Sequence, residues 1–136
     1  MKQAVREYLA ANAIEVEDVG TFSADSVDYP DYAEKVGLEV RDGRVERGIL
    51  VCGTGIGVCI AANKIRGIRA AAPCSPDTAR LSRQHNDANV LCLSGRHMAK
   101  ALALDLVKIW LETPFDGGRH QRRIDKITNL EIRSRP

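Results

Sequence analysis

The sequence lacks several features that would place it at once in a large class of proteins. It has no apolar run of about 18 residues, which a membrane-spanning helix needs. Its first residues also lack the apolar core of a secretion signal. We therefore expect a cytoplasmic protein that does not bind membranes. The net charge of +2 is small, so we expect no strong field that would gather nucleic acid.

The cysteine spacing excludes the common zinc and redox motifs. Four cysteines stand at positions 52, 59, 74 and 92, and no two have the Cys-x-x-Cys spacing. All four lie in or beside apolar stretches, so reduced and buried thiols are the first expectation. The cysteine spacing therefore gives no sign of a zinc site.

Short apolar runs alternate with stretches of helical periodicity over the whole chain. We predict strands at residues 14–19, 48–52, 69–72 and 89–93, and helices at residues 2–12, 29–41, 56–65, 75–85, 97–112 and 119–132. This order predicts one α/β domain over residues 1–136, a three-layer Rossmann-like parallel sheet with helices on both faces. In such sheets ligands bind at the carboxyl ends of the strands.

A glycine loop follows the predicted strand at 48–52 and opens a helix. It reads Gly53-Thr54-Gly55-Ile56-Gly57. Glycines allow successive backbone N–H groups to point into one concavity, where they bind a phosphate or a developing oxyanion. The loop has neither the Walker spacing nor the dinucleotide-binding spacing of glycines. A tight turn without a ligand is the alternative interpretation.

Cys52 precedes this loop as the last residue of its strand. Backbone N–H groups and the start of a helix lower the pKa of a nearby thiol, and a partly ionised thiol is a competent base near neutral pH. The alternative is that Cys52 only fills the core. We interpret Cys59, Cys74 and Cys92 as core residues because no such loop lies beside them.

Several polar residues are candidates for the same edge of the sheet. His85 and Asn86 precede a strand and are expected near the carboxyl edge or the rim of the sheet, where a histidine can move protons. A simple helix-terminal charge is the alternative. Arg96 follows the last strand. His97 and His120 are interpreted as surface groups.

Arg119 and Arg123 are four residues apart and share one face of a predicted helix. Two guanidinium groups so placed can hold a phosphate. A solvated basic helix is the alternative, because further arginines and lysines occupy the same tail.

Taken together, these segments resemble the type-B ribose-5-phosphate isomerases and the related galactose-6-phosphate isomerase subunits. The resemblance covers about residues 3–130 and rests on the stretches Ser26-Val27-Asp28-Tyr29-Pro30-Asp31-Tyr32-Ala33, Gly48-Ile49-Leu50-Val51-Cys52-Gly53-Thr54-Gly55-Ile56-Gly57, Ala61-Ala62-Asn63-Lys64, Gly67-Ile68-Arg69-Ala70, Arg83-Gln84-His85-Asn86-Asp87-Ala88-Asn89-Val90-Leu91 and Gly117-Gly118-Arg119-His120.

The resemblance implies an isomerase that interconverts ribose 5-phosphate and ribulose 5-phosphate on a five-stranded parallel sheet. It implies a homodimer or a dimer of dimers with active sites shared between subunits, and no cofactor. The roles it implies are Cys52 as base, residues 53–57 as the enediolate cradle, His85 in ring opening, Asn86 and Arg96 in substrate contact, Arg119 and Arg123 at the phosphate, and Tyr29 in the pocket lining.

One departure from the family concerns the N-terminal side. Family members begin with a central strand ending in Asp-His, and this sequence starts directly with the helix that follows it. The missing strand would leave a gap of roughly 9–10 Å between its neighbours. A misplaced start, a fragment and a paralogue with another role are the explanations considered.

These explanations leave other functions open. The chain as it stands is expected to be poorly stable and slow or inactive. A sugar-phosphate binding module without turnover and an isomerase of allose or galactose 6-phosphate are the alternative functions. Nucleic-acid binding by the arginine-rich tail is a weaker one.

Overall fold

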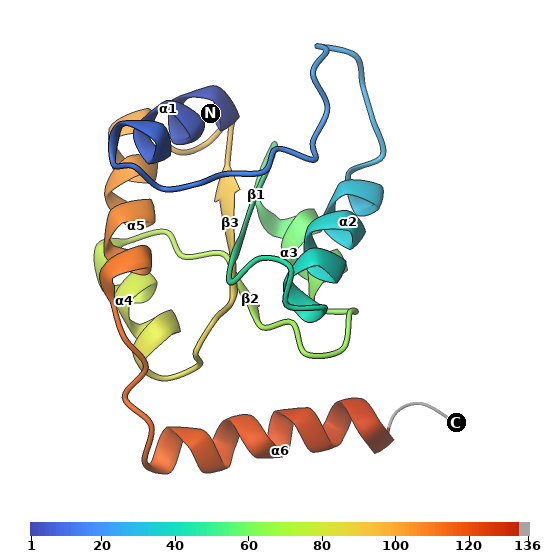
Figure 1. Ribbon diagram of the computed structural model, residues 1–136, viewed down its shortest axis with the longest axis vertical. Helices are drawn as coiled ribbons and strands as arrows, with labels where there is room; N and C mark the ends of the chain where they lie inside the picture. Colours follow the sequence, from blue (N-terminus) through green and yellow to red (C-terminus); the bar gives the residue numbers. More distant parts are fainter. Residues whose placement is uncertain (134–136) are drawn as a thin grey trace.

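The structure is a computed structural model that describes residues 1–133. The elements, in chain order, are α1 (Lys2–Ala11), α2 (Tyr29–Arg41), β1 (Gly48–Cys52), α3 (Ile56–Ala62), β2 (Ala70–Ala71), α4 (Pro76–Gln84), β3 (Val90–Ser94), α5 (Lys100–Glu112) and α6 (Arg119–Arg133) (Figure 1). None of the helices in this range combines the length and apolar character that crossing a bilayer requires.

The three strands form one parallel sheet in the order β1-β3-β2. Gly48 lies opposite Val90, and Cys52 lies opposite Ser94. Both strands therefore end at the same edge, and that edge is occupied by the loops after Cys52 and Ser94. The described residues contain three parallel strands rather than the five that the resemblance implies.

β3 is the central strand, and all five of its residues are buried. Its side chains alternate between two layers. Leu91 and Leu93 pack against α1, α4 and α5 around the fully buried Trp110. Val90 and Cys92 face α2 and α3 on the other side. The predicted fold class is thus confirmed: a parallel sheet carries helices on both faces (Figure 1).

Most predicted elements form within a few residues of their expected ends. The strand at 48–52 has its predicted bounds. α4 starts as predicted, because the Ser75 side chain accepts a hydrogen bond from the Thr78 backbone N–H and Pro76 occupies the first turn. α5 starts at Lys100, three residues later than expected.

The strand predicted at residues 14–19 is wrong. This segment connects α1 with α2 and joins no ladder in the described structure. Its period-two pattern is real, but a strand needs a neighbour within about 4.8 Å to satisfy its backbone. The segment passes β1 across a groove instead of pairing with it.

Asp18 holds the 14–19 segment onto α1. Its carboxylate lies 3.1 Å from Lys2 Nζ and 3.3 Å from Arg6 Nη1, and it accepts a hydrogen bond from the Gly20 N–H at 3.0 Å. Burial raises the pKa of Asp18, but these hydrogen bonds and the charges of Lys2 and Arg6 outweigh burial and hold it below its ordinary value.

We expect Asp18→Asn to lower the stability of the chain by about 1 kcal/mol at pH 7, because Lys2 and Arg6 are partly exposed and screened. Since the folded-state pKa is depressed, the carboxylate stabilises the fold above its unfolded pKa of about 3.9 and this contribution disappears as the pH falls through the folded pKa. Urea midpoints from pH 7 to pH 2 should therefore converge for the two proteins. The control Glu15→Gln, in the same segment but exposed, should follow the wild type throughout.

Candidate active site

The glycine loop (residues 53–57) turns the chain from β1 into α3 at the carboxyl edge of the sheet. Gly55 has a φ of +78°, and a Cβ at this position would lie 3.0 Å from the carbonyl carbon of Leu93. Backbone strain and steric overlap therefore both require glycine here. The loop is pressed against the end of β3, and Gly95 N–H donates to the Cys52 carbonyl oxygen at 2.8 Å.

The Cys52 thiol points back into this loop. The Gly55 backbone N–H donates a hydrogen bond to Sγ over 3.1 Å, and the residue is half-buried. Burial raises the pKa of the Cys52 thiol, but hydrogen bonds from the backbone of Val58, Gly55 and Thr54 and from the Thr54 side chain together lower it below the ordinary value. The thiolate is thus stabilised by donors that the loop provides.

Tyr29 and Arg96 border the same loop. Tyr29 packs against Gly57 so closely that a Cβ on the glycine would lie 2.6 Å from the ring carbon Cζ. The Arg96 side chain lies over Gly53, with Nε 3.5 Å from the position of a Cβ, and its backbone N–H donates to the Gly53 carbonyl at 3.1 Å. The structure therefore brings Cys52, the glycine loop, Tyr29 and Arg96 together, in what we call the thiol end.

His85 and Asn86 lie at the other end of the sheet, which corrects their expected position. His85 caps the end of α4 and precedes β3, and the first residue of β3 pairs with the first residue of β1. The amino ends of parallel strands meet at one edge, so His85 lies at the edge opposite Cys52. The five residues of β1 alone separate these edges by about 13 Å.

α6 places more basic groups beside His85. His120 stacks on His85, with ring centroids 4.1 Å apart and planes inclined by 10°. Arg119 and Arg123 flank His120 on the same helix, as predicted, and both are exposed. We call His85, Asn86, Arg119, His120 and Arg123 the basic end. It lies where α6 crosses below the sheet (Figure 1).

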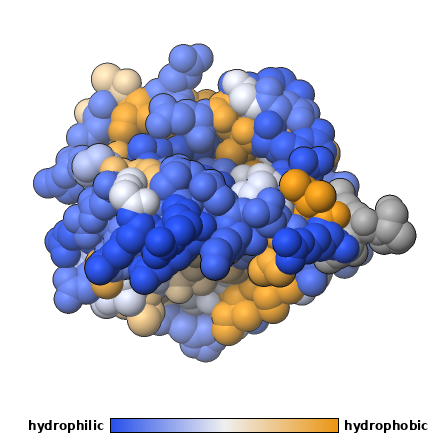
Figure 2. All heavy atoms as spheres, turned by 90° about the horizontal axis from the view of Figure 1, so that it is seen from below, coloured by the Kyte–Doolittle hydropathy of each residue, from blue (hydrophilic) through white to orange (hydrophobic). Residues whose placement is uncertain are grey.

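His120 is buried rather than a surface group, so that prediction was wrong. Burial lowers the pKa of His120, and the positive charges of His85, Arg119 and Arg123 lower it further. These shifts indicate a positive local potential, which suits an anion. Seen from below, the molecule is strongly hydrophilic along most of α6, with apolar side chains toward the C-terminal part (Figure 2).

Two arginines that the sequence analysis did not single out hold the turn after His85. Arg83 is buried and binds Asp87 Oδ1 at 2.8 Å and the Ala88 carbonyl at 2.7 Å. Arg69 donates to the Asn86 and Asp87 carbonyls. Asp87 has a φ of +44°, so the turn depends on these contacts. In the sequence, the i, i+4 spacing of Arg83 and Asp87 was the signal from which this ion pair could have been predicted.

The remaining cysteines divide by environment. Cys92 is buried in β3, as expected, and Cys59 is half-buried beneath it. Contact with Cys59 and burial raise the pKa of the Cys92 thiol, so it stays neutral. Cys74 is exposed, and its interpretation as a core residue was wrong.

One group in the described residues has the composition of a metal site. The possible ligand atoms of His85, Asp116 and His120 all lie within 4.8 Å of one another. Two imidazoles and one carboxylate are ligands that transition metals accept. Arg119 and Arg123 beside them oppose a cation, and the local charge favours a bound anion.

Fold and site together define a parallel α/β protein with a thiol of lowered pKa beside a glycine loop at one edge of its sheet and a cluster of basic side chains at the other. The chain belongs to the ribose/galactose isomerase family, whose model matches residues 1–127.

The similar proteins agree with this assignment. The chain is 47% identical to the ribose-5-phosphate isomerase B of Escherichia coli over 133 residues, which cover 98% of this chain and 89% of that protein. The structure resembles that of the Clostridium thermocellum ribose-5-phosphate isomerase B, with a TM-score of 0.97 at 47% identity and coverage of 98% and 90% of the two chains. It also resembles the Mycoplasma genitalium enzyme with bound ribulose-5-phosphate, with a TM-score of 0.93 at 45% identity and coverage of 98% and 89%.

We expect Gly55→Ala to destabilise the chain by about 2–4 kcal/mol, because a positive φ and overlap with the Leu93 backbone act together. Gly43→Ala is the matched control: it has a similar φ of +70° with nothing within 4 Å of the added Cβ, so it should cost only about 1 kcal/mol. Denaturant unfolding of both variants measures the difference. Equal losses would show that contact with β3 does not constrain the loop.

Proposed function

We propose that this protein interconverts ribose 5-phosphate and ribulose 5-phosphate, with Cys52 as the base that moves a proton between C1 and C2. The observation that carries the proposal is the Cys52 thiol, whose Sγ lies 3.1 Å from the Gly55 N–H within a loop that lowers its pKa. The names of the relatives support the substrate, and one similar structure contains ribulose-5-phosphate.

The chemistry follows from this arrangement. In the open-chain aldose, the Cys52 thiolate removes the proton from C2, and the C–H electrons form a C1=C2 double bond while O1 takes up negative charge. Backbone N–H groups of the glycine loop stabilise that oxyanion. The thiol then returns the proton to C1, a proton passes from O2 to O1, and C2 becomes the ketone carbon. No oxidant or cofactor is needed for this balance.

The basic end supplies the groups that the thiol end lacks. His85 is proposed to open the sugar ring by giving a proton to the ring oxygen and accepting one from the O1 hydroxyl. Arg119 and Arg123 are proposed to hold the phosphate, and Asn86 and Arg96 to contact the sugar. The lowered pKa of His120, caused by burial and by neighbouring positive charges, supports an anion site here.

Two copies of the chain are needed to complete such a site. Within one chain, Cys52 and His85 lie at opposite edges of the sheet, and an acid–base group must come within hydrogen-bond reach of its substrate. We therefore propose a homodimer or a dimer of dimers, in which the basic end of one subunit covers the thiol end of another. Exposed apolar side chains on α6, Ile127, Leu130 and Ile132, support self-association.

A sugar-phosphate binding module without turnover is the alternative. It predicts that ribose 5-phosphate binds without forming product, and that replacing Cys52 leaves the affinity unchanged, because a thiolate contributes little to holding a sugar phosphate. The location in the cytoplasm stays a prediction.

Cys52→Ala should lower kcat for ribose 5-phosphate by about 100-fold or more and change KM little, because a group that acts in the transition state is removed. Cys74→Ala, which removes an exposed thiol outside the glycine loop, is the control and should leave kcat unchanged. A coupled assay of ribulose 5-phosphate formation measures both. Unaltered turnover of Cys52→Ala would remove the proposed base.

Mixing two inactive variants tests whether the site is shared. Cys52→Ala and His85→Ala, unfolded together and refolded at equal concentration, should recover about a quarter of the wild-type rate. Half of the dimers are then mixed, and each mixed dimer contains one intact site. If both groups belonged to one chain, every site would carry a defect and the mixture would stay inactive.

A further inference from the structure

Ser94, the last residue of β3, lies beside Cys52 on one face of the sheet. The two residues are register partners in the parallel pairing of β1 with β3. Side chains alternate between the two faces along a strand, so Ser94 shares its face with Cys92, and Cys52 packs against that same layer. The sequence analysis did not single out Ser94, yet its side chain is polar and only 8% exposed. A buried hydroxyl needs hydrogen-bond partners, and the partners of Ser94 indicate its role.

The Ser94 hydroxyl uses both its donor and its acceptor at the glycine loop. Its O–H donates to the Gly53 carbonyl oxygen at 2.8 Å, and its Oγ accepts from the His97 backbone N–H at 2.9 Å. The Gly53 carbonyl oxygen also accepts from the Arg96 backbone N–H at 3.1 Å. Two donors from the end of β3 therefore fix the direction of this one carbonyl group.

The direction of the Gly53 carbonyl determines where the next backbone N–H points. The Gly53 carbonyl and the Thr54 N–H belong to one planar peptide unit and point in opposite directions. Since the carbonyl is held toward β3, the Thr54 N–H points away from it and toward the Cys52 thiol. Burial raises the pKa of this thiol, and backbone hydrogen bonds outweigh burial and lower it; they come from Val58, Gly55 and Thr54.

We propose that Ser94 is the residue that positions the glycine loop: its hydroxyl holds the Gly53–Thr54 peptide in the orientation in which the loop N–H groups face Cys52 and the substrate oxyanion. The part that concerns the oxyanion rests on the proposed function, whereas the part that concerns the thiol does not. Without the hydroxyl, the Gly53 carbonyl keeps the Arg96 N–H alone, and the peptide rotates more freely. Donors that are not held in place stabilise a developing charge less well.

Ser82 provides a matched control for the loss of a hydroxyl. It is also 8% exposed, and its O–H donates to the Ala79 carbonyl at 2.8 Å. Ser82 belongs to α4 and lies outside the glycine loop. Ser82→Ala and Ser94→Ala thus remove hydroxyls of equal burial and equal hydrogen-bond length, and both should lower the urea midpoint to a similar extent. Only Ser94→Ala should alter the Cys52 thiol.

The rate at which iodoacetamide alkylates Cys52 tests the orientation without any assay of turnover, because only the thiolate reacts. The 136-residue chain is alkylated at several pH values and digested with trypsin, and fragment ions of the peptide 48–64 distinguish Cys52 from Cys59. Ser94→Ala should slow alkylation of Cys52 about fivefold at pH 6.5, because a less stabilised thiolate has a higher pKa. At pH 10 the rates should converge. Ser82→Ala should follow the wild type at every pH.

A second pair of variants isolates the hydroxyl from the shape of the side chain. Thr and Val have the same branched shape and both suit a strand, but only Thr carries a hydroxyl. Ser94→Thr should therefore keep the wild-type alkylation profile, and Ser94→Val should shift it as Ser94→Ala does. This pair decides the question even if Ser94→Ala does not fold.

Turnover tests the part of the proposal that concerns the oxyanion. Ser94→Ala and Ser94→Val should lower kcat for ribose 5-phosphate about tenfold with little change in KM, because the loop donors act on charge that develops in the transition state. Ser94→Thr should restore kcat. The acid limb of kcat against pH should also move to higher pH in the two variants that lack the hydroxyl.

Three results would overturn the role of Ser94: an unshifted alkylation profile in the folded variants without the hydroxyl, an equal shift in Ser94→Thr, or an equal shift in Ser82→Ala. The tyrosine, cysteine and arginine side chains around the loop, Tyr29, Cys92 and Arg96, are the same in all variants and do not cause a difference. Wild-type turnover with an unshifted profile would overturn the role of Ser94 and leave the proposed function intact. A shifted profile in a chain without turnover would support the role of Ser94 at the thiol and overturn the proposed function.

Discussion

The parallel pairing of β1 with the buried strand β3 is the constraint on which the rest of the structure depends. It places Cys52 beside Ser94 at one edge and the turn after His85 at the other. The loops that follow β1 and β3 therefore contact each other at the thiol end, where the Arg96 side chain lies over Gly53. Each turn that precedes a strand lies at the basic end. One register thus separates the two halves of the proposed chemistry.

Local donors decide the state of the thiol. Burial raises the pKa of the Cys52 thiol, but it does not decide the outcome there. In β3, by contrast, contact with Cys59 and burial together raise the pKa of Cys92. Cys52 differs because Gly55 turns the backbone so that its N–H faces Sγ. That turn needs a positive φ and close approach to Leu93, which only glycine permits. The same residue that shapes the loop therefore stabilises the thiolate.

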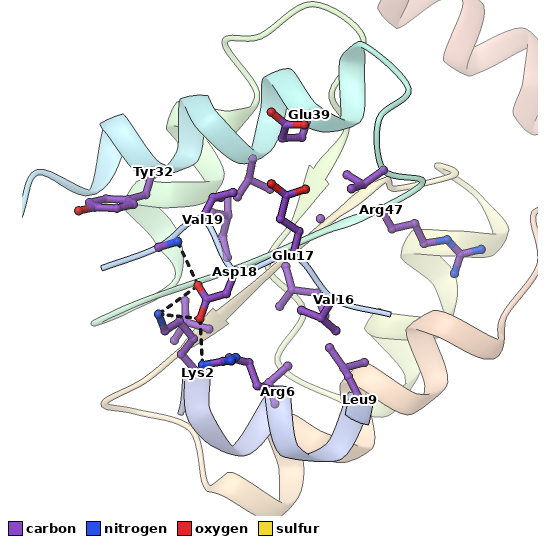
Figure 3. A pocket seen from close by; sticks show the side chains of 18 of the residues that line it. Lys2, Arg6, Leu9, Val16, Glu17, Asp18, Val19, Tyr32, Glu39 and Arg47 are labelled. Carbon is purple, nitrogen blue, oxygen red and sulfur yellow. Dashed lines mark hydrogen bonds and ion pairs between the residues drawn. The ribbon is translucent and has the colours of Figure 1, made fainter. Parts of the chain in front are cut away.

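Ion pairs and hydrogen bonds hold two irregular segments of the chain in place. Arg83 is buried, yet its guanidinium is satisfied by Asp87 and by backbone carbonyls, so the strained turn beside His85 is held in place. Asp18 fastens the 14–19 segment in the same manner (Figure 3), although that segment pairs with no strand among residues 1–133. Its extended form and the open edge of β1 together create the groove.

The sequence alone determined the elements whose signals are local. The apolar run at 48–52, the Ser75 cap with Pro76, and the glycine loop beside Cys52 all depend on neighbours within a few residues, and the structure confirms them. That residues 1–136 form one domain stays a prediction. Tertiary structure decided the rest. A strand needs a partner, so the alternating pattern at 14–19 was not sufficient to form one. The position of His85 follows from the parallel pairing of β1 with β3, and the burial of His120 follows from its stacking on His85. Both depend on contacts between distant segments, which the residue spacing within one segment does not reveal.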